Sequence, residues 1–259
     1  MNGNLQILDD GAAIAEAVAG HWRNLSREAI DARGGFHVAL AGGNTPRTLY
    51  QRLARADYRR ALDWQHTHIY FGDERCVPRD HPDSNFLMAQ QALLSRVPVP
   101  PSQVHPMFEP GDEPLPQAAE RSAARYADLL QARLPRSEDG LPVFDLILLG
   151  MGDDGHTASL FPGTAILQEQ TRPVAAQYVD KLDAWRISLT LPTINAARQV
   201  AILVSGESKA ERIAELARTA GDAPDERRTR YPVQRVRPQG RLNWYLDTAA
   251  ARLLNSEGA

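Results

Sequence analysis

The sequence predicts an α/β fold in which a mixed, largely parallel sheet is covered by helices on both faces. Two observations lead to this class. Short apolar runs alternate with amphipathic segments, and the order strand, loop, helix recurs four times along the chain. Such alternation is typical of parallel strands that are buried under helices. The 259 residues contain no stretch that separates two independent cores, so we expect a single domain over residues 1–259.

The first half of the chain predicts three helices and two strands before residue 95. Apolar residues recur at helical spacing from Asp10 onward, and Asp9 or Asp10 can cap that helix. Residues 36–41 are a short apolar run flanked by glycines, as in a buried strand. Thr45 and Pro46 then supply a cap and a proline at the first helical position. Residues 68–71 predict the next strand, which leads to a helix near residues 84–94.

The second half repeats this order. Residues 144–149 predict a strand followed by a helix near Thr157, and residues 199–205 predict a strand followed by a helix near residues 209–217. Further strands are predicted at residues 173–179, 186–191 and 243–246, which makes the sheet mixed. Pro/Gly-rich stretches at residues 97–116 and 221–240 predict long connections.

Composition excludes several classes of function. The chain is 43% hydrophobic with a net charge of -3, which argues against a protein that neutralises nucleic-acid phosphates. The single cysteine, Cys76, cannot form an internal disulfide and is interpreted as a packing residue. The first residues do not resemble a signal peptide, and no apolar run is long enough to cross a bilayer. We therefore expect a cytoplasmic protein that binds neither nucleic acid nor membrane.

Two loops after predicted strands have the composition of anion sites. Gly42, Gly43, Asn44 and Thr45 join a strand to a helix, where backbone N–H groups and the helix dipole favour a phosphate, although tight-turn geometry explains the glycines equally well. Asp73 and Arg75 follow the next strand, and the guanidinium can grip phosphate or sugar oxygens. A surface ion pair is the alternative interpretation of this second loop.

Glycines, two aspartates and a histidine are concentrated in the segment GMGDDGHTASLFPG, residues 150–163, which follows the apolar run FDLILL. Here His156 lies at the predicted start of a helix with Asp154 two residues before it. A helix N-terminus disfavours the cationic imidazole, whereas a neighbouring carboxylate orients the ring and stabilises the cation formed during proton transfer. These opposed influences suit a general base. A capping role is the alternative for His156 considered alone.

Other candidates are weaker. Ser159 lacks the GxSxG context of a nucleophile and is interpreted as a packing or capping residue inside the first turn of the predicted helix. Lys209 begins a predicted helix after a strand and can direct its ammonium group toward a bound phosphate. The remaining histidines are scattered and no HExxH motif occurs, so we predict no metal.

The order of these segments resembles the 6-phosphogluconolactonase family. The resemblance rests on LAGGNTP, FGDERCVPRDHPDSNF, GMGDDGHTASLFPG and RISLTLPTINAARQVAILVSGESKAE, and it continues through YPVQRV and WYLDTAAA. It implies the helix-covered α/β sandwich of sugar-phosphate isomerases and deaminases. It also implies hydrolysis of 6-phospho-D-glucono-1,5-lactone to 6-phosphogluconate in the oxidative pentose phosphate pathway, without a metal or organic cofactor.

The resemblance also implies roles for individual residues. The glycine loop, Arg75 and Lys209 become phosphate or substrate contacts, with Arg186 as an addition, while Asp73 and Asp154 organise the site beside His156. Asn44 stands where the family commonly has serine, which keeps the backbone cradle but removes a hydroxyl. The hypothesis is that His156 takes a proton from the water that attacks C1 of the lactone.

The sequence leaves two alternatives to the lactonase function. A glucosamine-6-phosphate deaminase or sugar-phosphate isomerase can use a similar glycine loop and DGH motif, but such deaminases continue DGH into IAFNEP-like sequence and carry DEY where this chain has DER. A non-catalytic sugar-phosphate sensor is an alternative of another class. We expect the lactonase because residues 157–162 follow the lactonase pattern.

Overall fold

A computed structural model describes residues 2–218 and 230–254. Its main feature is a sheet of six strands in the order β1-β9-β8-β5-β2-β3, and every neighbouring pair is parallel. The strands are β1 (Asn4–Leu8), β2 (Phe36–Leu40), β3 (Thr67–Phe71), β5 (Leu146–Leu149), β8 (Gln199–Val204) and β9 (Arg241–Asp247). The sequence predicted all of them except β1, an edge strand whose residues are largely exposed.

A second, smaller sheet is antiparallel and has the order β4-β7-β6. It consists of β4 (Asp73–Arg75), β6 (Val174–Val179) and β7 (Ala184–Leu189). The α/β class and the largely parallel sheet are confirmed, but the expected single mixed sheet is instead two sheets. The physical reason is that β6 and β7 form a hairpin, which pairs with the short β4 and not with the parallel strands.

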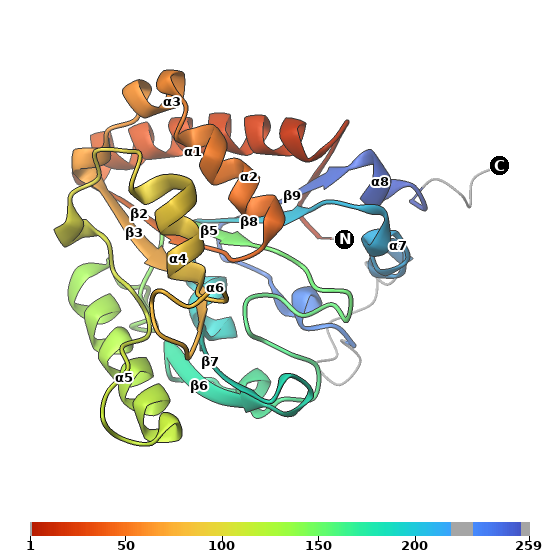
Figure 1. The fold of residues 1–259 in the computed structure, drawn as a ribbon. Helices are drawn as coiled ribbons and strands as arrows, with labels where there is room; N and C mark the ends of the chain where they lie inside the picture. Colours follow the sequence, from red (N-terminus) through yellow and green to blue (C-terminus); the bar gives the residue numbers. More distant parts are fainter. Residues whose placement is uncertain (1, 219–229, 255–259) are drawn as a thin grey trace.

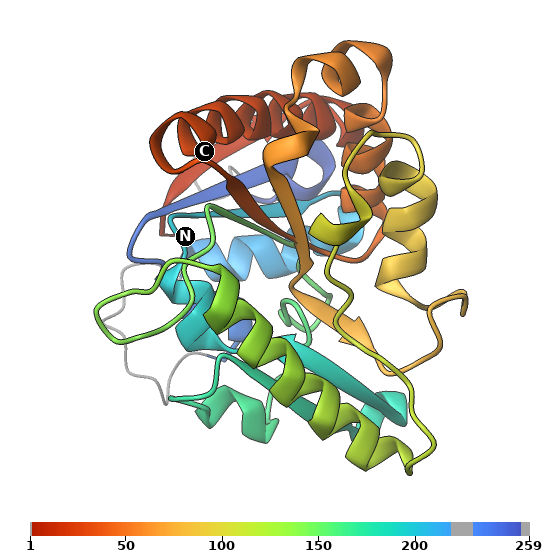
Figure 2. The ribbon, with the colours of Figure 1, turned by 90° about the vertical axis from the view of Figure 1, so that its left-hand side faces the viewer.

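Helices cover both sheets (Figure 1). The first two helices lie on the upper face of the six-stranded sheet in that view, and the fifth lies across the small sheet, as Figure 2 shows from the side. The helices are α1 (Gly11–Arg33), α2 (Asn44–Leu53), α3 (Ala56–Ala61), α4 (Asn85–Ala89), α5 (Leu115–Arg133), α6 (Leu191–Ala196), α7 (Ala210–Arg218) and α8 (Thr248–Ala251).

Local signals explain where several helices begin and end. Asp10 caps α1 as predicted, because its carboxylate accepts hydrogen bonds from the backbone N–H groups of Ala12 and Ala13. Gly34 ends the same helix with a φ of 78°, a left-handed conformation that glycine adopts without strain. Ser84 caps α4, and a π-helical turn continues it over Gln90–Leu94. These two predicted helices are therefore confirmed.

Two other sequence predictions concern the connections, and a third concerns membrane spans. Residues 97–116 form a long connection, as expected, with one 3-10 turn at Pro101–Gln103 before α5 begins. Of the connection predicted at residues 221–240, residues 221–229 lie outside the described part of the chain. Within the described residues, no helix has the length and apolar character needed to cross a bilayer.

Candidate active site

The site lies where the order of strands in the large sheet reverses. From β2 the chain enters β3 on one side, and it later returns to β5 on the other side of β2. The loops that follow β2 and β5 therefore diverge and leave a crevice, the usual place for a ligand in an open parallel sheet. A cleft of about 540 Å³ occupies this position.

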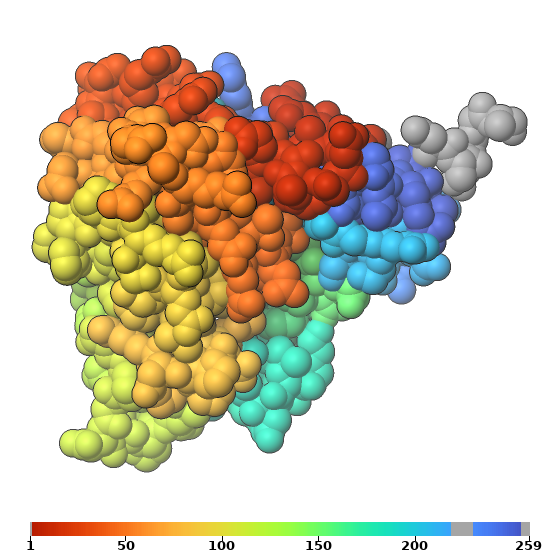
Figure 3. Space-filling view, turned by 45° about the horizontal axis from the view of Figure 1, so that its top comes forward, coloured from red at the N-terminus to blue at the C-terminus, as the bar shows by residue number. Residues whose placement is uncertain are grey.

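This cleft brings together most of the residues that the sequence singled out. In Figure 3, the orange surface of α2, the green surface after β5 and the light-blue surface after β8 border one another. Asp154 is the exception, because it lies beside His156 and does not line the cleft. The predicted residues that line it are Gly42, Gly43, Asn44, Thr45, Asp73, Arg75, His156, Arg186 and Lys209.

The loop after β5 does not form the predicted helix near Thr157. The Thr157 hydroxyl donates a hydrogen bond to the carbonyl of Gly150, and the backbone N–H of Gly152 donates to the carbonyl of His156. Ala158 has a φ of 46°, which is incompatible with a right-handed helix, and Pro162 lacks an N–H group. The loop is thus a series of turns, and the predicted helix dipole does not act on His156.

His156 is instead controlled by burial and by one carboxylate. Its Nδ1 lies 2.5 Å from Asp154 Oδ1, and the same oxygen accepts the backbone N–H of His156. Burial lowers the pKa of the imidazole, an effect that the negative charge of Asp73 opposes. No hydrogen bond joins Nε2 to any described residue. A carboxylate on Nδ1 selects the tautomer in which Nε2 has a free lone pair, which is the state required of a base.

Asp73 is buried on the floor of the cleft and is held by two side chains. Ser159 donates its hydroxyl hydrogen bond to Asp73 Oδ2 at 2.7 Å, and Asn85 donates to the Asp73 carbonyl at 2.9 Å. Ser159 lies in a turn, so the prediction that it lies inside the first turn of a helix is wrong. Its hydroxyl is committed to a carboxylate, and no described histidine hydrogen-bonds it, so the geometry does not make it a nucleophile.

Glu74, the acid between Asp73 and Arg75, has a structural role. Its buried carboxylate accepts backbone N–H groups of Arg75, Asn85 and Phe86, each at 2.8 Å. Burial raises the pKa of this carboxyl in spite of the three donors. These bonds tie the strand β4 to the first turn of α4, and they hold Asn85 where it reaches Asp73.

The glycine loop ends at the N-terminus of α2, which lacks a side-chain cap. The helix begins at Asn44, two residues before the predicted first helical residue Pro46, and Thr45 does not cap it. Gly43 has a φ of 99° at the N-cap position, a conformation that glycine adopts readily. A Cβ on Gly42 would lie 2.1 Å from Asn85 Oδ1. The two glycines therefore serve close packing and turn geometry, and the uncapped helix N-terminus opens into the cleft.

The three cations that the sequence singled out line the same cleft as this helix end. Arg75 on β4 and Arg186 on β7 are register neighbours, and Lys209 follows β8. No hydrogen bond or ion pair joins the Arg186 side chain to another described residue, whereas Lys209 pairs with Asp153 at 2.5 Å. Burial lowers the pKa of Arg186, and the positive charge of Arg75 adds to this effect. Two adjacent guanidinium groups in one cleft favour an anionic ligand.

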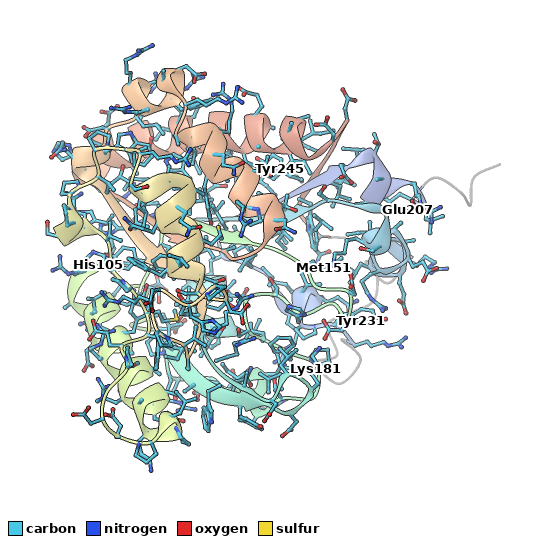
Figure 4. The ribbon with its side chains drawn as sticks, in the orientation of Figure 1. His105, Met151, Lys181, Glu207, Tyr231 and Tyr245 are labelled. Carbon is cyan, nitrogen blue, oxygen red and sulfur yellow. The ribbon has the colours of Figure 1, made fainter. Side chains whose placement is uncertain are left out.

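One charged residue of the cleft was not predicted from the sequence. Lys181 lies in the turn between β6 and β7, and its ammonium group forms an ion pair with Asp154 Oδ2. In Figure 4 it lies on the same side of the molecule as Met151, which also lines the cleft. A charged residue in a polar hairpin turn carries no distinguishing signal, so only its tertiary contact identifies it. The described residues contain no group of three or more His, Cys, Asp or Glu side chains suited to a metal ion.

Comparisons with known proteins agree with this geometry. Residues 9–244 match the family model of glucosamine-6-phosphate isomerases/6-phosphogluconolactonase. The chain is 42% identical to the 6-phosphogluconolactonase of Synechocystis sp. over 88% of each chain, and 39% identical to that of Streptomyces coelicolor over 95% of this chain and 92% of the relative. The structure of 6-phosphogluconolactonase from Trypanosoma brucei superposes with a TM-score of 0.82, at 29% identity, over 98% of this chain and 99% of that chain. The chain therefore belongs to the glucosamine-6-phosphate isomerase/6-phosphogluconolactonase family.

Proposed function

We propose that this protein is a 6-phosphogluconolactonase, an enzyme that hydrolyses 6-phospho-D-glucono-1,5-lactone to 6-phospho-D-gluconate in the oxidative pentose phosphate pathway. One observation carries the proposal. A single cleft holds a partly buried imidazole, fixed through Nδ1 by Asp154, together with four cations and an uncapped helix N-terminus. A neutral base beside an anion site is what hydrolysis of a phosphorylated lactone requires. The curated relatives named above have this activity in their names.

The phosphate of the substrate binds among the cations in this proposal. Arg186 is the strongest candidate, because its guanidinium is partly buried and has no hydrogen-bond or ion-pair partner among the described residues. Arg75 and Lys209 contribute further positive charge, and the backbone N–H groups of Gly43, Asn44 and Thr45 complete the cradle. Asp73 faces the same cleft and accepts hydrogen bonds from sugar hydroxyls. The phosphate then anchors the substrate while its lactone carbon faces His156.

The proposed hydrolysis depends on a neutral His156 ring. The neutral ring accepts a proton from water at Nε2 as the water oxygen bonds to C1 of the lactone, and Asp154 stabilises the imidazolium that forms. The tetrahedral intermediate then breaks its bond between C1 and the ring oxygen. The imidazolium returns the proton to that oxygen, which becomes the C5 hydroxyl of 6-phosphogluconate. No covalent enzyme intermediate is needed.

The proposal includes two further features of the chain. Residues 1–259 form one domain in this proposal, because residues of both sheets contribute to one hydrophobic core.

We also place the reaction in the cytoplasm, because a single buried cysteine suits a reducing compartment. Cell fractionation with a C-terminal tag tests the second point, and recovery outside the cytoplasmic fraction would contradict it.

Acid release from freshly generated 6-phosphogluconolactone tests the function. The wild-type protein is expected to accelerate this release above the spontaneous rate, and His156→Ala is expected to lose about 10² to 10⁴ in kcat. His66→Ala is the matched control, since His66 is exposed and, among the described residues, forms an ion pair only with Asp63. Near-normal turnover by His156→Ala, or no acceleration by the wild type, would refute the proposal. Ammonia release from glucosamine 6-phosphate, measured in parallel, tests the deaminase alternative.

A further inference from the structure

Lys181 connects the β6–β7 hairpin to the loop that carries His156. Its ammonium group pairs with Asp154 Oδ2, while Asp154 Oδ1 holds Nδ1 of His156. The same ammonium lies 4.6 Å from the centre of the Phe161 ring, and the Phe161 and His156 rings are 4.2 Å apart. The four side chains therefore form one cluster, in which Lys181 is the only member from outside the loop.

The choice of lysine at this position is unusual for this chain. Of the 29 Lys and Arg residues, only Lys181 and Lys209 are lysines. Both line the cleft, and both pair with an aspartate of the His156 loop. An ammonium is a compact charge on a flexible stem, whereas a guanidinium is a planar fork that needs more room. A compact cation suits a position between a carboxylate and the face of an aromatic ring.

We propose that Lys181 is a positioning residue, which holds the Asp154 carboxylate against Nδ1 of His156 from the tip of the β6–β7 hairpin. This inference rests on the proposed function of His156 as the base. Asp154 has one oxygen for each partner, so the ion pair with Lys181 restricts the rotation of the carboxylate. With the carboxylate held, the imidazole has one orientation in which Nε2 faces the substrate.

The charge of Lys181 also acts on the protonation of His156. Other charged groups face this ring from every side: Asp153 and Asp154 from its own loop, Asp73 from β4, Arg186 from β7 and Lys209 after β8. Without Lys181, the charge of Asp154 is no longer balanced by its partner, and the imidazolium becomes more stable. The base would then be protonated over a wider range of pH.

The experiment compares the wild type with Lys181→Met and Lys181→Arg. For Lys181→Met we expect kcat to fall roughly 10-fold with KM changed less than about two-fold, because orientation of the base is lost and not substrate binding. The acid limb of kcat/KM is expected to move up by about half a pH unit, the size of an exposed charge pair. Lys181→Arg keeps the charge, so its acid limb should stay at the wild-type position.

Arg60→Met is the matched control. It removes one positive charge from an exposed residue of α3, which lies at the opposite end of the molecule from β6 and β7 in Figure 1, and it should leave kcat and the acid limb unchanged. An acid limb that does not move in Lys181→Met would overturn the inference. A higher KM with unchanged kcat would also overturn it, because Lys181 would then be a substrate contact. The same holds if Lys181→Arg shifts the limb as far as Lys181→Met.

An NMR titration separates this inference from the proposed function. The Hε1 resonance of His156 is assigned by its loss in His156→Gln, and its titration midpoint is measured without substrate in the wild type and in Lys181→Met. A higher midpoint in the variant supports the role of Lys181 even if the wild type fails to hydrolyse the lactone. An unchanged midpoint contradicts that role even if the wild type is an active lactonase.

Discussion

The most specific test of the site is Gly152→Ala. Gly152 lies against the His156 ring, and a Cβ at this position would be 2.1 Å from both Nδ1 and Cε1 of the imidazole. Ordinary contact begins at about 3.4 Å, so the ring must move by about 1.3 Å. The φ of Gly152 lies outside the left-handed region, and the substitution therefore strains the contact with the ring and not the backbone.

The expected consequence is kinetic. A displacement of about 1 Å at a reacting group can cost roughly 100-fold in rate, which corresponds to about 2.7 kcal/mol of transition-state stabilisation. The added Cβ does not contact the cations or the helix N-terminus that we propose to bind phosphate, so KM should change little. The measurement is steady-state hydrolysis of the lactone, with the spontaneous rate subtracted.

Gly20→Ala provides the control for Gly152→Ala. It makes the same chemical change in α1, where the one contact that the added Cβ makes with the described residues is with Tyr58 Oη at 3.7 Å, an ordinary distance. This variant should keep full activity. A folded Gly152→Ala enzyme with kcat within two-fold of the wild type would refute the assignment of His156, since the base would then be tolerant of displacement.

Two further predictions concern binding and acid stability. In steady-state assays, Arg186→Met should raise KM at least 10-fold and lower kcat by a smaller factor. The reason is that loss of a phosphate contact weakens the binding of the ground state and of the transition state alike. A defect confined to kcat would contradict this prediction. Burial lowers the pKa of His37 and His105 to about 4, so the folded state resists their protonation. The full stability of the folded state with both histidines neutral is present above about pH 6.5. Between pH 6.5 and 4 the unfolding free energy should fall by at most about 1.4 kcal/mol per pH unit for each histidine. His105→Phe keeps the ring packed on Tyr70 and should flatten this dependence in urea titrations, whereas an unchanged slope would exclude His105 as a source.

Much of the architecture follows from local patterns. The capped start of α1, the apolar runs of β2, β5 and β8 and the Ser84 cap of α4 all depend on neighbours within one or two turns, so their residues predict them directly. The edge strand β1 lacks such a pattern, because its side chains are mostly exposed. Its position is decided by pairing with β9 at the other end of the chain.

The candidate site, like the fold, has features that nearby residues predict and features that depend on tertiary contacts. The sequence by itself determined that His156, Asp154 and the glycine loop follow strands whose ends meet at one edge, because motif and strand order are properties of nearby residues. Only the tertiary structure decided that the His156 loop is a series of turns and that Lys181 holds Asp154. The physical reason is that these outcomes depend on contacts between distant segments: Ser159 meets Asp73 across 86 residues, and Lys181 meets Asp154 across 27.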